Sequence, residues 1–441
     1  MSAGKYGSTR PSPMHDREGN RICLKSTDIC VISQYFLPDM NGDVTRLLGA
    51  LDALMTAGFR VTLVTAVPHY PLGRIPPKYR GKRFYREHWK GIDIIRVPIM
   101  SRPHEGFLNR LLLYLSFAMF SSFSLPLVRK TDIVWAFSPK VFSSLPATLL
   151  KSLKRAVLVT DMTDIWPQAL VNTGYLKTKS KLFVMISAFV SYIFMTSNCI
   201  LTLTEAMRSF ISSEWRSSRG KLQILRNPGD TDLFAPIAVD RPRELKGKFI
   251  VMYSGNIGSN YDFRTVLSCA EELRDRGDIV FIIRGDGEMK KTIASHISRH
   301  RLKNVVLDDR MLDRRVLVEY LNIADAYLLP MKKCEYPDAS MPMKLLDYIS
   351  CGKPVLCCAE GYLPELVSSS KAGLTVAPND HIGLAEAVLT LKENDTLRKK
   401  MGTNARKLAL HLFSNDVFKK EITRIFTKIA PNEHDRQLGK A

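Results

Sequence analysis

The sequence is short of acidic residues and has no paired cysteines. It holds 43 Asp+Glu against 64 Lys+Arg, which gives a formal charge of +21. Its eight cysteines form no CxxC pair and fall largely in apolar segments, so we expect reduced core residues rather than a zinc or disulfide framework. No helix-turn-helix, zinc-finger or RNA-recognition pattern accompanies the charge, and we expect no nucleic-acid partner. Residues 1–25 are polar, show no signal-peptide pattern and are expected to form a flexible tail.

The excess of positive charge lies in the first half of the chain. Residues 1–227 contain 31 Lys+Arg and 14 Asp+Glu, whereas the remaining residues contain 33 and 29. The densest cluster, residues 74–90, holds seven basic residues and one glutamate. Such a cluster favours an anionic membrane surface as a partner, and a merely solvated basic loop is the alternative.

Long uncharged runs are few, and two of them, residues 111–128 and 182–204, approach the roughly 20 residues that a membrane-spanning helix needs. Serines and a proline interrupt the first run, and Thr196-Ser-Asn198 interrupts the second. We therefore predict helices that are buried or lie on a membrane surface, with a spanning helix as the alternative.

Buried-strand patterns alternate with helix patterns along the chain. A strand over 28–33, a Pro/Gly loop, a helix over 44–57 and a strand over 60–65 open one series, and a second series begins with a strand over 249–254. This alternation predicts two doubly wound α/β domains that face a cleft. We assign residues 26–227 to the first domain, 228–248 to a linker and 249–410 to the second domain. Residues 411–430 form a helix that can return to the first domain, and 431–441 form a tail.

Residues 336–361, YPDASMPMKLLDYISCGKPVLCCAEG, are the most informative stretch. A polar loop precedes a predicted helix that begins near Met343 and ends at Gly352. The unpaired amides and the dipole at a helix N-terminus favour an anion. Lys344 in the first turn suits a diphosphate, and Asp347 one turn later suits a sugar diol. An ordinary loop–helix–strand with a solvated lysine is the alternative.

This stretch resembles the donor-site helix of the retaining glycosyltransferases of family 4, which have the GT-B fold. The similarity is greatest to the branch that builds exopolysaccharide, O-antigen and surface-glycan units, where SxPxKLxEYxAxGKPV is usual. The family's pair of glutamates is reduced here to Asp347, because Ala339 stands at the earlier position. The resemblance implies that Ser340, backbone amides and Lys344 take over that work.

Two glycine loops after predicted strands complete the implied donor site. Gly255-Asn-Ile-Gly258 follows the strand over 249–254, and Arg284-Gly-Asp-Gly287 follows a strand over 279–283. Backbone amides of such loops can bind phosphate. Arg284 can pair with a donor phosphate through two parallel hydrogen bonds, or form a surface pair with Asp286. The donor-binding residues are then Gly255, Asn256, Gly258, Gly285, Ser340, Met341, Met343 and Asp347.

Loops of the first domain supply the implied acceptor side. Gly42 follows the first strand, and His69 and Tyr70 lie in PHYPLGRI, which is similar to a PxYPxGxI loop of the family. Asp164 and Trp166 lie in DMTDIWPQ, which is similar to RDLWPE. The alternatives are a tight-turn glycine, an unspecialised histidine and an Asx turn at Asp164. Phe137 stands where many relatives have a histidine, so no catalytic histidine is assigned.

The resemblance implies a glycosyltransferase, of hexosyl or N-acetylhexosaminyl type, that uses a nucleotide-sugar donor and retains the anomeric configuration. We expect a membrane lipid-linked acceptor, surface polysaccharide or glycan assembly, and a cytoplasmic protein peripheral on the inner face of the cell membrane. Lys344 and Arg284 would stabilise the leaving diphosphate, and Asp164 would orient the acceptor hydroxyl. No DxD motif stands at a strand end, so we expect neither a metal nor another cofactor. A nucleotide-sugar epimerase of this fold and an inactive, basic membrane-binding protein are the alternatives.

Overall fold

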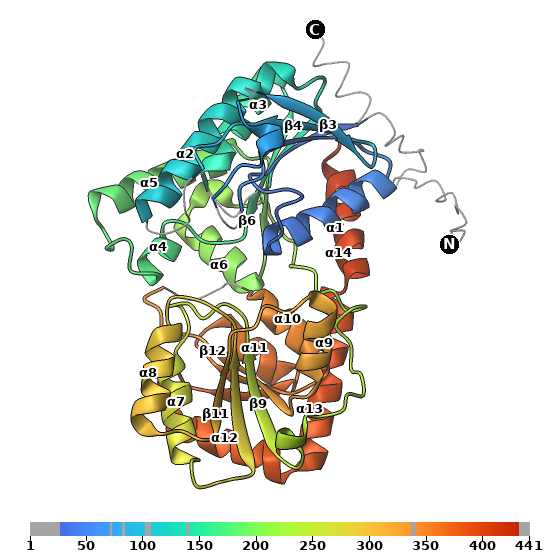
Figure 1. Cartoon of the computed structure of the whole chain (residues 1–441). Coiled ribbons are helices and arrows are strands. Elements are labelled where there is room, and N and C mark those ends of the chain that lie inside the picture. The colour runs from blue at the N-terminus through green and yellow to red at the C-terminus, as the bar shows by residue number, and fades with distance from the viewer. Residues whose placement is uncertain are drawn as a thin grey trace, which may run out of the picture.

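The computed structural model describes residues 27–70, 73–81, 84–101, 107–137, 141–336 and 341–431. These residues form two α/β domains, one above the other in Figure 1. The first domain is drawn mainly in blue to green, and the second mainly in yellow to orange. The prediction of two doubly wound domains is confirmed.

The first domain is built on an eight-stranded sheet with the order β3-β4-β2-β1-β5-β6-β7-β8. Its strands run parallel except for β3, which is antiparallel to β4. Most of these strands are buried and rich in Val, Ile and Leu, as expected when helices cover both faces of a sheet. The strands are β1 Asp28–Ile32, β2 Arg60–Ala66, β3 Tyr85–Trp89, β4 Ile92–Val97, β5 Ile133–Ala136, β6 Val157–Met162, β7 Cys199–Thr202 and β8 Leu222–Ile224.

Six α-helices connect these strands in the described residues. The first one begins at Asn41, whose side chain caps it by accepting a hydrogen bond from the Val44 amide at 2.9 Å. The start of this helix, with Gly42, lies at the end of the domain that faces Met343 of the second domain. The helices are α1 Gly42–Thr56, α2 Phe107–Ser124, α3 Ser144–Lys154, α4 Gln168–Asn172, α5 Lys181–Thr196 and α6 Glu205–Glu214.

The second domain is built on a six-stranded parallel sheet with the order β11-β10-β9-β12-β13-β14. The chain order reverses between β9 and β12, and ligands of such sheets bind beyond the strand ends at this point. The strands are β9 Phe249–Ser254, β10 Ile279–Arg284, β11 Val305–Asp308, β12 Ala326–Pro330, β13 Val355–Cys358 and β14 Gly373–Val376. The helices are α7 Phe263–Glu272, α8 Lys290–His300, α9 Arg314–Asn322, α10 Met343–Ser350, α11 Tyr362–Ser369, α12 His381–Glu393 and α13 Asp395–Leu408.

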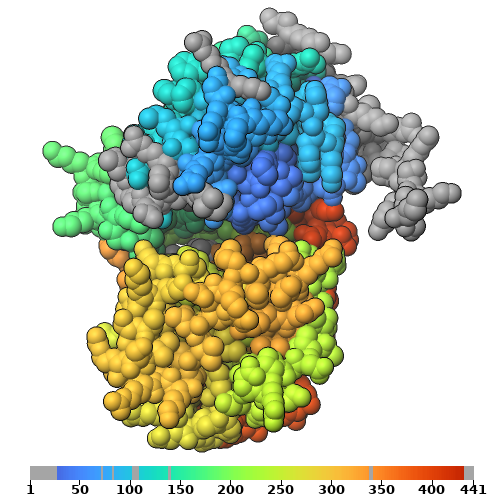
Figure 2. Space-filling view, in the orientation of Figure 1, coloured from blue at the N-terminus to red at the C-terminus, as the bar shows by residue number. Residues whose placement is uncertain are grey.

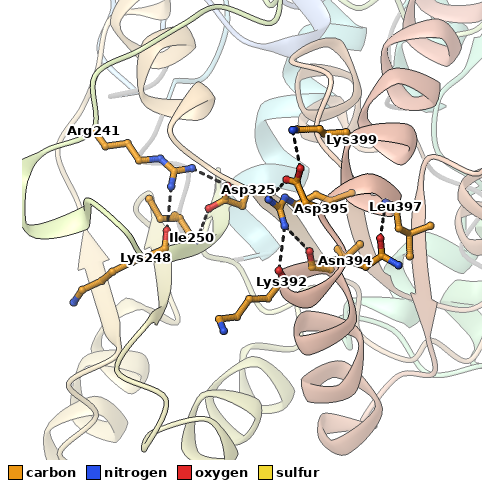
Figure 3. Close-up of polar contacts among 11 residues, drawn as sticks. Arg241, Lys248, Ile250, Asp325, Lys392, Asn394, Asp395, Leu397 and Lys399 are labelled. Carbon is orange, nitrogen blue, oxygen red and sulfur yellow. Dashed lines mark hydrogen bonds and ion pairs between the residues drawn. The ribbon is translucent and has the colours of Figure 1, made fainter.

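Residues 228–248, between the two sheets, pack on the second domain. Arg241 donates to the carbonyl of Lys248 at 3.0 Å and to Asp325 at 2.8 Å. The other oxygen of Asp325 accepts from the Ile250 amide at 2.8 Å, so this segment is bonded to the start of β9 (Figure 3). Arg406 on α13 also donates to the Thr231 and Phe234 carbonyls. The segment is therefore part of the second domain's surface.

The chain returns to the first domain through α14, Asn415–Ile429, which packs on α1 (Figure 1). Its buried side chains include Phe418, Ile422 and Phe426, which belong to the same apolar cluster as Leu47 of α1. The chain passes between the domains twice, near Gly229 and near Phe413. These two segments lie side by side, because the Gly229 amide donates to the Phe413 carbonyl at 2.6 Å.

The two long apolar runs form α2 and α5, which lie in the helical layers of the first domain. Asn109–Leu127 is long and apolar enough to cross a membrane by length and composition, and 39% of that window is buried in the protein. A core helix passes the same test. Leu113 and Phe117 of α2 are buried in the cluster that contains strands β2 and β4. If α2 crossed a membrane, Leu113 and Phe117 would have to leave this core.

Candidate functional site

A cleft of about 660 Å³ lies between the two domains. Figure 2 shows the boundary along which it opens, with the first domain in blue above the orange and yellow second domain. The first domain contributes the start of α1, and the second contributes the starts of α9 and α10. Among its lining residues are Asn41, Gly42, Thr45, Asp230, Arg314, Met343 and Asp347.

Lys344 lies on the first turn of α10 with its amine between two aromatic rings. Its Nζ is 3.9 Å from the ring centre of Tyr253 and 3.6 Å from that of Tyr261, and it also bonds to the Tyr253 hydroxyl. Desolvation lowers the pKa of Lys344 well below its ordinary value. The alternative of a solvated lysine is therefore wrong. An anion placed beside this amine would restore its charge.

Because Gly255 has no side chain, the Lys344 side chain can lie directly against it. A β-carbon at this position would lie 2.8 Å from Lys344 Cε and 2.9 Å from Nζ. The glycine also has φ of +147°, which side chains rarely adopt. The first glycine loop and the α10 lysine are thus brought together as the sequence predicts.

The two glycine loops pack backbone to backbone at the ends of β9 and β10. A β-carbon on Gly285 would overlap the carbonyl oxygen of Gly255. The Gly255 amide donates to the Arg284 carbonyl at 2.9 Å, and the Gly285 amide donates to the Asp308 carbonyl at 2.9 Å. These two amides already have protein partners, so the two glycines serve close packing. Phosphate binding by Asn256 and Gly258 stays a prediction.

Asp347 lies in the cleft, one turn after Lys344. Burial raises the pKa of Asp347 to about 7, an effect that nearby Arg314 opposes and Asp230 increases. Arg314 also pairs with Asp230 at 3.1 Å. Neither Asp230 nor Arg314 was predicted from the sequence as a site residue, and both line the cleft. Both residues lie close to Asp347, so they belong to the candidate site.

Arg284 is buried rather than directed at solvent. Its guanidinium donates to the Arg310 carbonyl at 2.6 Å and lies 5.5 Å from the ring centre of Tyr320. Asp286 pairs instead with Lys290, at 3.4 Å. The alternative of a surface pair with Asp286 is therefore wrong. Because protein groups occupy the guanidinium, a direct role for Arg284 on the donor phosphate requires these contacts to change.

Asp164 and Trp166 lie together in the wall of a second, apolar pocket of about 360 Å³. Trp166 is buried and meets Phe142 edge to face, with ring centres 5.9 Å apart. Its ring is therefore mainly part of the pocket wall. The pocket lies within the first domain, on the side predicted to hold the acceptor.

His69 and Tyr70 differ in exposure. His69 is 2% exposed, stacks on Tyr35 and bonds through Nδ1 to the Val67 carbonyl at 2.9 Å. Burial lowers the pKa of His69 to about 4, so the ring is neutral near pH 7. The expected contact between His69 and an acceptor is not supported by this buried position, whereas Tyr70 is exposed. The sequence PHYPLGRI does not show which of its side chains are buried, so the burial of His69 could not be predicted from it.

The remaining donor-side residues lie at the cleft or beside it. Met341 is buried and its carbonyl accepts from the Asn227 side chain at 3.4 Å, while Met343 lines the cleft opposite Gly42. A β-carbon on Gly42 would lie 3.5 Å from Met343 Cγ, so the two domains approach closely here. Ser340 lies outside the described residues.

One group of described side chains has the spacing of metal ligands. Glu271 on α7 and His296 and His300 on α8 place one ligand atom each within 4.8 Å of the others. Glu271 bonds to both rings, at 2.5 Å and 3.1 Å, and these bonds account for the arrangement. None of these residues lines the interdomain cleft.

Residues 238–408 match the family model described as "Glycosyl transferases group 1". A protein of Escherichia coli K12 that is named as a colanic acid biosynthesis glycosyl transferase, WcaI, is 25% identical over 409 residues, which cover 88% of this chain and 99% of that protein. A chitobiosyldiphosphodolichol beta-mannosyltransferase of Kluyveromyces lactis is 24% identical over 324 residues, covering 63% of this chain and 67% of its own.

Solved structures share the fold. Sucrose-phosphate synthase from Thermosynechococcus elongatus aligns with a TM-score of 0.71 at 15% identity, over 91% of this chain and 99% of its own. Anabaena HepE in complex with UDP aligns with a TM-score of 0.62 at 14% identity, over 91% and 100%. The second domain thus matches the model of group 1 glycosyltransferases, most of the chain is similar to a protein named as a glycosyl transferase, and the two-domain fold is the GT-B fold of the solved structures.

Proposed function

We propose that the chain transfers a sugar from a nucleotide-sugar donor, held by the second domain, to a lipid-linked acceptor held by the first, in the assembly of a surface polysaccharide. The observation that carries this proposal is the amine of Lys344, held against Gly255 at the switch point of the second sheet. The relatives support it, because one is named for colanic acid biosynthesis and another for a dolichol-linked acceptor. The UDP complex of HepE supports a nucleoside diphosphate as the leaving group.

The difficult step is departure of the diphosphate from the anomeric carbon. As that carbon–oxygen bond breaks, negative charge grows on the leaving phosphate and positive charge grows on the sugar. Lys344 would stabilise the leaving phosphate. In the free enzyme its amine is desolvated, so an ion pair with the phosphate would stabilise the charged amine and favour departure of the diphosphate. The acceptor hydroxyl would then attack the anomeric carbon from the same face and give its proton to the departing phosphate, with retention of configuration. Asp347 would hold a diol of the nucleotide.

In this scheme Lys344 stabilises the leaving diphosphate, and we propose a reaction that needs neither a metal nor another cofactor. Asp164, which lines the apolar pocket of the first domain, would orient the acceptor hydroxyl from that domain. The basic cluster at residues 74–90 would place this side of the molecule on an anionic membrane, so that the protein works as a peripheral protein on the cytoplasmic face.

Lys344→Ala tests the proposal. Turnover should fall about a hundredfold or more, as when other preorganised charge stabilisers are removed, while the unfolding temperature stays near that of the wild type. The assay presents a panel of nucleotide sugars with membrane lipid extract and follows acceptor-dependent release of nucleoside diphosphate. Near-normal turnover of a folded variant would remove Lys344 from the mechanism. Conversion of the donor without any acceptor would instead indicate an epimerase.

A further inference from the structure

Three polar side chains of the second domain meet at its surface, away from the interdomain cleft. Glu271 lies on α7, and His296 and His300 lie on α8, which packs against α7 (Figure 1). His296 Nε2 is 2.5 Å and His300 Nδ1 is 3.1 Å from the same oxygen, Oε1 of Glu271. One nitrogen of each ring and one carboxylate oxygen therefore face a common point, and all three atoms lie within 4.8 Å of one another.

The helices explain why these side chains converge. His296 and His300 are four residues apart on α8, so they lie on one face of that helix, one turn apart. Their rings stack with centres 4.2 Å apart and planes 3° from parallel. Two histidines at this spacing present both nitrogen ligands to a zinc ion in helical metal motifs, and a glutamate is a usual third ligand. Glu272 is not part of the group, since it faces His381 at 4.0 Å.

The electrostatic surroundings of the group favour a cation. Glu271 and His300 lie in the last turns of their helices, where unpaired carbonyls and the helix dipole give partial negative charge. If both rings were protonated, two positive charges would stack 4.2 Å apart and repel each other. A bound divalent cation avoids this repulsion, because both rings are then neutral. Each ring would bind the metal through the nitrogen that faces Glu271 and keep its proton on the other nitrogen.

The group is open to solvent and its atoms select the class of metal. The side chains of Glu271, His296 and His300 are 26%, 25% and 37% exposed. A metal can therefore reach them from solution, and water can complete its coordination. Imidazole nitrogens suit zinc and similar transition ions, whereas magnesium and calcium prefer oxygen ligands.

We propose that Glu271, His296 and His300 bind a zinc ion that fastens α8 to α7. Ile293 is the one buried residue of α8 among residues 290–300, all of which the structure describes, and it joins the apolar cluster that contains Val266 of α7. The ion would add a second attachment near the end of α8. None of its three ligands lines the cleft, so the site is separate from the proposed transfer and does not depend on it.

Calorimetry with zinc chloride tests the proposal on the full chain, after EDTA treatment and transfer to chelator-free buffer. We expect wild type to bind zinc, and His296→Gln and Glu271→Gln each to bind it at least about tenfold more weakly. The double variant His296→Gln/His300→Gln should lose the site. His381→Gln is the matched control, because it changes a histidine of the same domain outside the group, and it should bind zinc like wild type. No binding by wild type, or equal affinity in wild type and the double variant, would overturn the proposal.

Thermal unfolding gives a second test, because a metal that binds only the native state stabilises it. Zinc at about a hundredfold excess over its Kd should raise the unfolding temperature of wild type by roughly 5 °C relative to EDTA. The double variant should show no such rise, and its cooperative unfolding in EDTA would show that it is folded. An equal rise in the double variant would place the ion elsewhere and overturn the proposal. An equal rise with magnesium chloride would overturn the assignment to nitrogen ligands. Neither measurement uses sugar transfer, so a failure of the proposed function is distinguishable from a failure of this site.

Discussion

At the scale of single residues, the candidate site depends on groups removed from water. Lys344 lies between aromatic rings and Asp347 lies in the cleft. Burial lowers the pKa of Lys344 and raises the pKa of Asp347, so it favours the neutral form of each. Burial thus destabilises the charged forms of both side chains as long as no ligand is bound. A bound diphosphate would restore the charge of Lys344.

Gly255→Ala should disable Lys344 without touching it. The added methyl would lie 2.8 Å from Lys344 Cε, and φ at this position is unfavourable for alanine. We expect the lysine to be displaced and turnover to fall toward the level of Lys344→Ala. Gly277→Ala is the control, because a β-carbon there meets nothing within 4 Å. Equal kcat values in the two alanine variants would show that the contact with Gly255 is dispensable.

Asp347→Asn should raise stability and weaken nucleotide binding. Because the pKa of Asp347 is raised to about 7, the native state binds more protons than the unfolded state between about pH 4 and 7. Stability from this group therefore falls as pH rises through that window and stays low above it. The Asn variant should unfold at a higher temperature than wild type at pH 8, and the difference should vanish near pH 4. Calorimetry at pH 8 should show weaker nucleotide binding, and a difference in unfolding temperature that does not change with pH would contradict the assignment.

At the scale of elements, a buried ion pair joins α1 to β6. Arg46 pairs with Asp161, donates to the Leu225 carbonyl at 3.2 Å, and lies 5.3 Å from the ring centre of Phe137 and 5.7 Å from that of Phe418. The Arg46 guanidinium of α1 thus contacts residues of β6, of the segment that follows β8, and of α14. The ring of Phe137 therefore packs against this buried guanidinium.

Arg46→Met should be strongly destabilising, because it leaves the Asp161 carboxyl buried without its partner. Removing one member of a buried pair typically costs about 3–5 kcal/mol. Arg60→Met is the matched control, since its partner Asp28 forms an ion pair at the surface, where pairs contribute about 0–1 kcal/mol. Denaturant unfolding of both variants measures the difference. Similar losses in the two would show that burial of Asp161 is relieved in another way.

The elements themselves could largely be predicted from sequence. The expected strand over 28–33 is β1, and the expected helix over 44–57 is α1, which starts two residues earlier because Asn41 caps it. Alternating buried strands and amphipathic helices are local signals, and they determine this fold class. The direction of a side chain just after a strand is not local. For that reason the burial of Arg284 and His69 was not foreseen.

The partners of Lys344 show the same limit. Tyr253 lies inside the apolar run of β9, where an aromatic residue is ordinary, and only the folded sheet brings it to α10. Arg314 begins a helix of unremarkable sequence and meets Asp230 across 84 positions of the chain. Contacts between distant segments carry no signature in one sequence. The predicted helix start and the resemblance both indicated Lys344 and Asp347, but neither indicated which residues surround them.

At the scale of the whole molecule, the first domain carries both the basic cluster and a set of exposed apolar side chains on neighbouring helices. The basic cluster includes Lys78 and Arg80, and the exposed apolar residues lie on α2, α3 and α5. α2 contacts α3, and α3 contacts α5, so these helices are neighbours. Electrostatic attraction to anionic lipid is screened by salt, whereas apolar insertion is not.

Binding to anionic vesicles should therefore weaken as salt rises, without vanishing. Replacing Lys78, Arg80, Lys82 and Arg83 by Gln should remove most of the salt-dependent part, at about 1 kcal/mol for each charge near the surface. Arg86 is left unchanged because it donates to the Leu127 carbonyl at 2.9 Å. Vesicle sedimentation at several salt concentrations measures the effect. Retention in carbonate-washed membranes as firm as that of a spanning protein would contradict peripheral binding.

The position of α14 also determines the order in which the molecule can be completed during synthesis. The second domain is continuous in sequence, so a ribosome delivers all of it in one stretch. The first domain lacks Phe418, Ile422 and Phe426 until residues 415–429 have been made, and its apolar surface on α1 stays uncovered until then. Domains generally fold as units while the chain grows, and exposed apolar surface favours aggregation. The domain that is translated first is therefore the one that is finished last.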